Sequence, residues 1–130
     1  MTKREEFKLE FLKIKSPADG QIDFACQSTE DYNPYGCFFF LNLLDVFEAD
    51  HFIDEITLIQ NNLPYDPDFI FTDATEIIAI EFNNPYFLLE NHLEIHMDDF
   101  KALIQEWKNF ITMASPPTLR QRVSKWFKRL

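Results

Sequence analysis

Residues 98–114 read DDFKALIQEWKNFITMA, and this segment constrains how the rest of the chain can fold. Its apolar residues recur at spacings of three and four, which predicts an amphipathic helix with one broad apolar face. Asp98 can cap this helix, Asp99 falls in its favourable first turn, and Ser115-Pro116-Pro117 ends it. The apolar face needs a surface to pack on, and the residues before it must supply that surface. The face consists of Phe100, Leu103, Ile104, Trp107, Phe110, Ile111 and Ala114.

The residues that precede this helix predict a β-sheet. Apolar residues alternate with polar ones at Phe7–Phe11 and Ile22–Cys26, whereas Cys37–Leu44 is apolar at every position but Asn42, as expected of a central strand. Residues 46–62 fit both periods, and we favour extended structure with an irregular, acid-rich middle. We therefore expect an α+β fold: a mostly antiparallel β-sheet of five to seven strands with the C-terminal amphipathic helix packed on it. The remaining strands are expected at Phe69–Thr72, Glu76–Phe82, Tyr86–Glu90 and Leu93–Met97, with a two-residue hairpin turn at Asn91-His92.

Length and charge divide the chain into two parts. We expect residues 1–115 to form a single acidic α+β domain and residues 116–130 to form a short basic amphipathic helix. The tail has five basic residues and no acid, so the formal charge of −10 is the sum of +5 in the tail and −15 in the domain. The apolar side of the tail helix would carry Leu119, Val123, Trp126, Phe127 and Leu130.

The interval from Ser16 to Asp99 contains eighteen of the chain's 22 acidic residues and no lysine or arginine. Its many aromatic and β-branched residues show that it must fold and is not a disordered acidic tail. A surface of this sign repels nucleic acid and anionic membranes and attracts basic proteins. We therefore expect a basic protein partner and no nucleic acid. The candidate partner-binding residues are Asp45, Glu48, Asp50, Asp54, Glu55, Asp66, Asp68, Asp73 and Glu76.

Other classes of function find little support in the sequence. No Ser-centred, P-loop or HExxH motif occurs, so we expect no enzymatic activity, no catalytic residue and no cofactor. His92, Glu94 and His96 would share one face of a straight strand and could hold a metal, but a turn at Asn91-His92 would remove His92 from that face. We therefore expect no metal site.

The N-terminal sequence and the number of cysteines predict where the protein is located. No signal-peptide pattern and no apolar run long enough to span a membrane is present, and we expect a cytoplasmic protein. Cys26 and Cys37 are too few for a disulfide framework and are expected to be buried thiols.

The strand-turn-helix pattern near the C-terminus resembles a known group of proteins. Residues 77–81 and 86–95, followed by the run F-x-x-L-I-x-E-W-x-x-F-I at residues 100–111, are similar to the C-terminal part of small immunity proteins from bacterial polymorphic and contact-dependent toxin systems. The resemblance covers about a quarter of the chain and carries over no binding residue. It implies a non-enzymatic protein that binds and blocks a cognate toxin domain, often a nuclease.

Charge and resemblance together predict an immunity-type inhibitor that neutralises a cognate toxin domain through its acidic surface. A nuclease must present Lys and Arg to phosphate, so an inhibitor can bind by imitating the polyanion. The alternative is a non-enzymatic adaptor or membrane-surface protein that acts through its basic C-terminal helix. The number of protomers stays open at this point.

Overall fold

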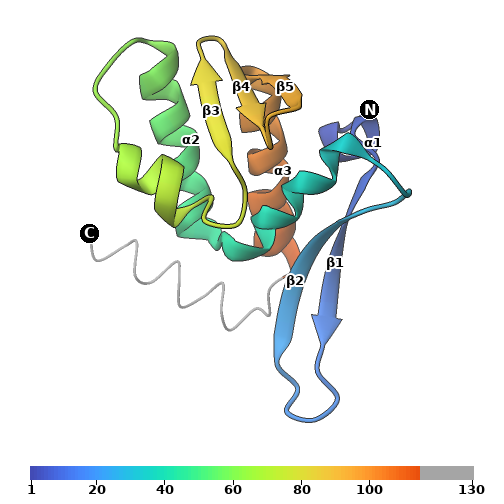
Figure 1. Ribbon diagram of the computed structural model, residues 1–130. Coiled ribbons are helices and arrows are strands. Elements are labelled where there is room, and N and C mark those ends of the chain that lie inside the picture. The colour runs from blue at the N-terminus through green and yellow to red at the C-terminus, as the bar shows by residue number, and fades with distance from the viewer. Residues whose placement is uncertain (115–130) are drawn as a thin grey trace, which may run out of the picture.

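The computed structural model describes residues 1–114, so the basic helix predicted at residues 116–130 lies outside the described residues. The fold is α+β, and the elements follow one another as Figure 1 shows. The helical elements are α1 (Lys3–Glu6), the 3-10 helix η1 (Pro34–Leu43), α2 (Val46–Gln60), the π-helical turn η2 (Phe69–Asp73) and α3 (Met97–Ala114). The strands are β1 (Leu9–Lys15), β2 (Ile22–Ser28), β3 (Ile80–Asn83), β4 (Tyr86–Leu89) and β5 (Leu93–His96).

The strands form two small sheets, so the prediction of a single sheet of five to seven strands is wrong. β1 and β2 form an antiparallel hairpin of their own, and β3, β4 and β5 form a separate antiparallel meander in that order. The two sheets cannot join because three segments expected to be strands are helical. These segments are Cys37–Leu44 in η1, residues 46–60 in α2 and Phe69–Thr72 in η2.

Local sequence features explain the helical segments. The Asn33 side chain accepts a hydrogen bond from the Tyr35 backbone N–H at 3.0 Å, and Pro34 occupies the first turn, so η1 begins with a capped, pre-set turn. An apolar run with little periodicity fits a buried helix as well as a buried strand. In η1, the Asn42 side chain accepts a hydrogen bond from the Cys26 backbone N–H at 2.6 Å, which ties η1 to β2.

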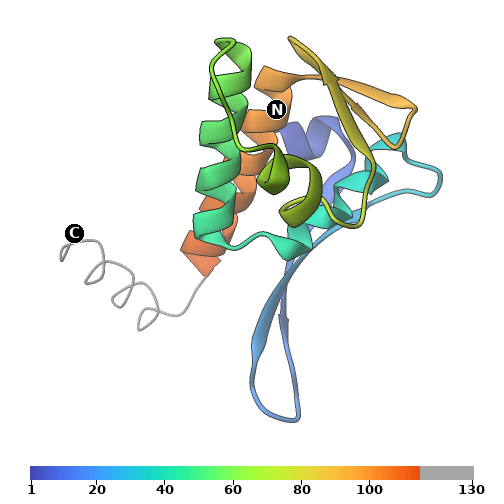
Figure 2. The same ribbon diagram turned by 60° about the vertical axis from the view of Figure 1, so that its left-hand side comes forward.

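The helices α2 and α3 form an antiparallel pair, which Figure 2 shows from the side. Three polar contacts cross between them in matching register: Asp50 with Lys108, Thr57 with Lys101, and Gln60 with Asp98. The meander lies beside one end of this pair. There the Asn84 amide donates hydrogen bonds to the Ile59 and Gln60 carbonyls, which lack an i+4 helical partner because α2 ends at that point.

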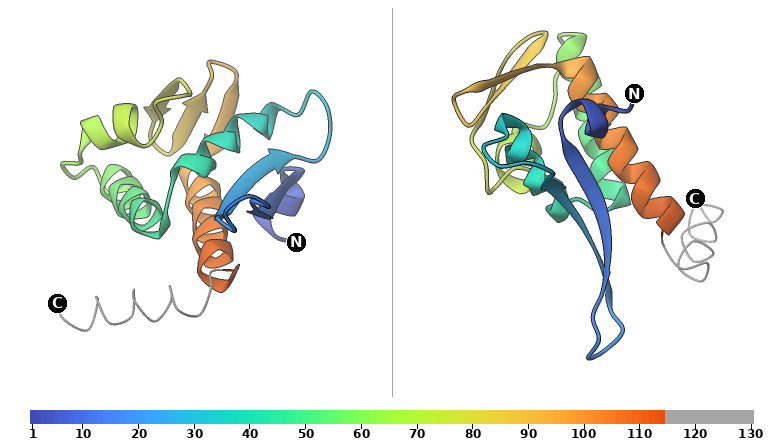
Figure 3. Two further views of the ribbon diagram at one scale, coloured as in Figure 1. Left: turned by 90° about the horizontal axis from the view of Figure 1, so that it is seen from below. Right: turned by 90° about the vertical axis from the view of Figure 1, so that its right-hand side faces the viewer.

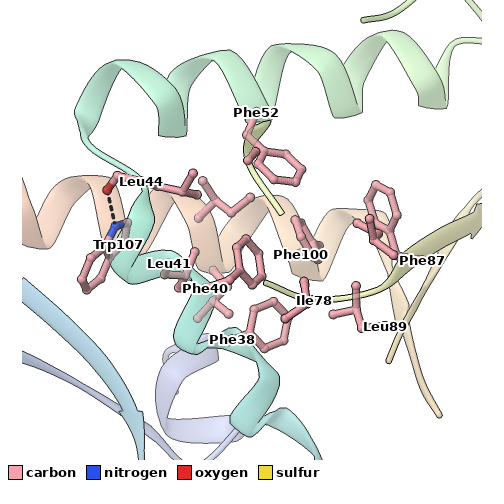
Figure 4. Packing of buried hydrophobic residues seen from close by; sticks show 14 of the residues in the cluster. Phe38, Phe40, Leu41, Leu44, Phe52, Ile78, Phe87, Leu89, Phe100 and Trp107 are labelled. Carbon is pink, nitrogen blue, oxygen red and sulfur yellow. Dashed lines mark hydrogen bonds between the residues drawn. The ribbon is translucent and has the colours of Figure 1, made fainter. Parts of the chain in front are cut away.

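The core fills the space between the helix pair, η1 and the meander (Figure 4). The predicted apolar face of α3 is confirmed, since Phe100, Leu103, Ile104 and Trp107 are all buried. Phe100 contacts aromatic rings from η1, α2 and β4, and the Trp107 indole N–H donates to the Leu44 carbonyl at 3.0 Å. The fully buried phenylalanines are Phe38, Phe40, Phe52, Phe87 and Phe100.

The β1–β2 hairpin projects from the body, as Figure 1 and the right-hand view in Figure 3 show. Its first half packs on α3, where Phe11 meets Trp107 edge-on with ring centroids 5.1 Å apart. Its outer half carries the exposed residues Lys13, Ile14 and Lys15. Residues 1–114 thus combine a densely packed body with one slender, charged arm.

Candidate functional site

The fold brings together the two runs of acidic residues predicted to bind a partner. Asp45, Glu48, Asp50, Asp54 and Glu55 lie in or at the start of α2. Asp66, Asp68, Asp73 and Glu76 lie in and around η2. The two segments are adjacent because the Phe69 ring stacks on His51, with centroids 3.8 Å apart, and the Asp66 backbone N–H donates to the Glu55 carboxylate at 2.7 Å.

Asp45 and Glu48 form the start of α2. The Asp45 carboxylate accepts from the Glu48 backbone N–H at 2.8 Å, and the Glu48 carboxylate accepts from the Asp45 backbone N–H at 3.3 Å. This reciprocal capping box explains why the chain turns helical at Val46. Partial burial raises the pKa of Glu48, and the hydrogen bond from Asp45 opposes that shift. Asp45 itself stays exposed.

Two of the predicted binding residues already form contacts with other parts of the chain. Glu55 is only 8% exposed, and its carboxylate also contacts the His51 Nε2 at 3.1 Å, so it fastens the chain that follows α2 to the helix. Asp50 forms an ion pair with Lys108 of α3. These two carboxylates stabilise the helix packing, and neither offers a free charge to a partner.

Six further predicted binding residues are exposed and form no ion pair within residues 1–114. We call this set the acidic surface. Its members are Asp45, Asp54, Asp66, Asp68, Asp73 and Glu76, each exposed to solvent.

The lysines and arginines of the described chain lie on other elements, although Lys101 and Lys108 of α3 contact Thr57 and Asp50 of α2. Five occur between residues 3 and 15, in or beside α1 and β1, and two occur in α3. Lys3 pairs with Glu6 and Asp99, Arg4 with Glu106, and Lys8 with Glu30. The separation of signs is therefore a property of the fold as well as of the sequence.

An aromatic cluster beside the acidic surface was missed by the sequence analysis. Tyr65, Phe71 and Phe82 contact one another, with ring centroids 5.6 to 6.4 Å apart. The prediction of a strand at Phe69–Thr72 is wrong for Phe71, which lies in the helical turn η2, whereas Phe82 lies on strand β3 as predicted. The acid-flanked tyrosine in the loop at residues 63–68 was the only signal in the sequence that pointed to this place.

The histidines that could have held a metal do not share a strand, because His92 lies in the turn before β5 and His96 at the end of β5. Leu89 pairs with Leu93, so the connection consists of Glu90, Asn91 and His92, one residue longer than predicted. His92 Nδ1 lies 2.8 Å from the Glu90 carbonyl oxygen, and His96 Nδ1 accepts from the Asp98 backbone N–H at 3.0 Å. Among residues 1–114, no three His, Cys, Asp or Glu side chains come together in a metal-binding arrangement.

The two cysteines lie in the interior as free thiols. Cys26 on β2 and Cys37 on η1 are both buried, and burial raises the pKa of each thiol to about 12. At neutral pH both remain protonated and are poor nucleophiles. They therefore contribute to packing in this part of the chain.

A membrane-crossing helix is not found in the described part of the chain, since no helix there combines the required length with sufficient hydropathy. Comparison with protein-family models, with curated protein sequences and with solved structures gave no match to this chain. The case for a function therefore depends on the geometry and charge of the residues described above.

Proposed function

We propose that this protein is a non-catalytic, immunity-type inhibitor that binds a basic toxin domain through its acidic surface. The observation that carries the proposal is that six exposed carboxylates on two adjacent segments form no ion pair within residues 1–114. Surfaces that serve only solubility intersperse both signs, because unrelieved repulsion destabilises the folded state. A cationic partner would relieve that repulsion.

The chemistry of the partner follows from the sign and spread of these charges. A domain that acts on nucleic acid presents lysines and arginines along its substrate channel, and a row of carboxylates can occupy the same positions as phosphates. The inhibitor then blocks access to the substrate and needs no reaction of its own. A nuclease toxin is the class of partner that this surface fits best.

The experiment begins with the gene immediately upstream of the one that encodes this protein. The C-terminal domain of the upstream product is purified, its binding to the full-length chain is measured by calorimetry, and cell survival is scored on co-expression. We expect tight binding, loss of toxicity, and at least a tenfold loss of affinity for Asp68→Lys combined with Asp73→Lys.

A matched control separates the acidic surface from charge in general. Lys13→Glu combined with Lys15→Glu changes two exposed charges on the hairpin arm and should leave affinity within about twofold. An upstream metabolic enzyme with no affinity for this chain, or an equal loss of affinity in both double variants, contradicts the proposal.

A further inference from the structure

The cluster of Tyr65, Phe71 and Phe82 has features that a purely structural contact does not require. Phe71 and Phe82 stack with centroids 6.0 Å apart and planes 8° apart, and Tyr65 meets both rings edge-on. Within η2, Phe69 and Ile70 are buried, whereas Phe71 is 37% exposed. A large apolar ring is thus held at the surface at a position where a polar residue would suit solvent better.

The cluster is anchored from beneath. The Phe82 ring faces the core side of β3 and contacts the fully buried Phe87, with centroids 6.3 Å apart. The outer rings therefore rest on rigid elements and lose little conformational freedom when a partner binds. The Tyr65 hydroxyl makes no hydrogen bond to any residue between 1 and 114, so it is available to a partner.

Acidic residues neighbour these rings in the sequence. Asp66 follows Tyr65 in the chain, and Asp68 and Asp73 lie on either side of Phe71. All three carboxylates belong to the acidic surface. The negative faces of the rings and the neighbouring carboxylates attract the same kind of group, which is a cation with a flat or apolar body.

Elsewhere the chain supplies such cations itself. In residues 1–114 the cation–π contacts are Lys3 over Phe7 and Arg4 over Phe11, 5.9 and 4.9 Å from the ring centroids. Both occur in the N-terminal segment, where basic residues are present. The Tyr65–Phe71–Phe82 cluster has the ring faces and the acids but no cation from the described chain.

We propose that this cluster is the anchor point of the interface, where a basic protein partner places an arginine side chain. This inference rests on the proposed function and locates the centre of that interface. A guanidinium group stacks on an aromatic face while its N–H groups donate to carboxylates such as those of Asp68 and Asp73, whereas a lysine ammonium group is a compact point charge. Aromatic residues with a polar rim are typical of binding hot spots.

The test uses the full-length chain and two synthetic probes, octa-arginine and octa-lysine, with affinity measured by calorimetry at low ionic strength. Phe71→Leu keeps an apolar side chain of similar volume but removes the ring. We expect it to weaken octa-arginine binding about two- to fivefold, the effect of losing one exposed cation–π contact, and to affect octa-lysine less. Combining it with Tyr65→Leu should weaken octa-arginine binding about tenfold.

The matched control is Phe39→Leu, because Phe39 is 44% exposed on η1 and outside the acidic surface. It should leave both affinities unchanged, and amide NMR spectra establish that each variant is folded. Equal losses for Phe71→Leu and Phe39→Leu, or equal losses for the two peptides, overturn the arginine anchor.

The two proposals fail in different ways. If Asp68→Asn combined with Asp73→Asn weakens octa-arginine binding while Phe71→Leu does not, the anchor is wrong and the acidic surface is retained. If octa-arginine does not bind, or binds with no dependence on these carboxylates, both proposals fail. Shifts of the Phe71 and Tyr65 ring resonances during titration with octa-arginine support the anchor, and unchanged resonances contradict it.

Discussion

The N-terminal segment at residues 1–28 and the α2–η2 segment at residues 45–76 carry charge in opposite ways. The first contains five basic and five acidic residues, whereas the second contains nine acidic residues and no lysine or arginine. In the first, Lys3 pairs with Glu6 and Glu10 accepts a hydrogen bond from Gln27. The first pairs its charges locally, while the second combines exposed carboxylates and an aromatic cluster that form no ion pair or cation–π contact with residues 1–114.

Trp107 connects these two regions and should give the largest effect. Its ring contacts Phe11 from the N-terminal segment, and its N–H reaches the Leu44 carbonyl just before α2. Trp107→Ala should lower the free energy of unfolding by about 3–5 kcal/mol, because it leaves a cavity and an unpaired carbonyl. Urea denaturation measures this loss.

Met113→Ala on the same helix is the control, since Met113 is 74% exposed. Its effect should stay within about 0.5 kcal/mol. A midpoint for Trp107→Ala that matches the midpoint for Met113→Ala would contradict the packing of α3 against both regions.

The next largest effect is the difference in stability between substituting a buried and an exposed acid within the α2–η2 segment. Glu55→Ala removes the carboxylate that accepts a hydrogen bond from the Asp66 backbone N–H and contacts His51. It should lower the free energy of unfolding by about 1–3 kcal/mol, because partly buried donors lose their acceptor. The adjacent Asp54→Ala, at an exposed position, should change stability by less than about 0.5 kcal/mol. Chemical denaturation of the two variants compares them directly.

Amide exchange localises the loss. In Glu55→Ala, protection at Asp66 and in η2 should fall more than protection in α3. Equal stability of the Glu55→Ala and Asp54→Ala variants would show that the neighbouring carboxylates play the same part, contrary to the contacts described here.

The contrast in charge between the N-terminal and α2–η2 segments could largely be predicted from the sequence. The fold could be predicted only in part. The periodicity of residues 98–114 identified α3 because one polar and one apolar face follow a single period. Residues 46–60 carry further apolar residues such as Phe47 and Ile53 outside the buried face, which obscures the helical period, yet the Asp45-x-x-Glu48 signature of a capping box was present and would have identified α2.

The continuous apolar run at residues 37–44 could not be resolved by pattern, since both faces of the element were apolar. In η1, Cys37, Phe38, Phe40 and Leu41 are buried while Phe39 is exposed, a distribution that depends on packing against β2, α2 and α3. The aromatic cluster could not be predicted by pattern either, because it requires Tyr65 in a loop, Phe71 in η2 and Phe82 on β3 to fold against one another. Contacts of that kind follow from tertiary structure and not from local spacing.

The smallest effect concerns long-range repulsion. Asp68→Asn combined with Asp73→Asn should raise the free energy of unfolding by a few tenths of a kcal/mol at low salt, because like charges repel within the acidic surface. Lys13→Gln combined with Lys15→Gln in the balanced N-terminal segment should lower it slightly or leave it unchanged. Thermal melts at low and high salt measure both, and equal shifts in one direction would contradict the contrast between the two regions.

The association rate with the proposed partner, the C-terminal domain of the upstream gene's product, tests the central claim most directly. Stopped-flow measurements across ionic strength should show a rate that falls at least tenfold between about 20 mM and 200 mM salt, as expected of electrostatic steering. Asp68→Lys combined with Asp73→Lys should slow association at low salt much more than Lys13→Glu combined with Lys15→Glu. A rate that does not depend on salt, or that responds equally to both double variants, would contradict binding through the acidic surface.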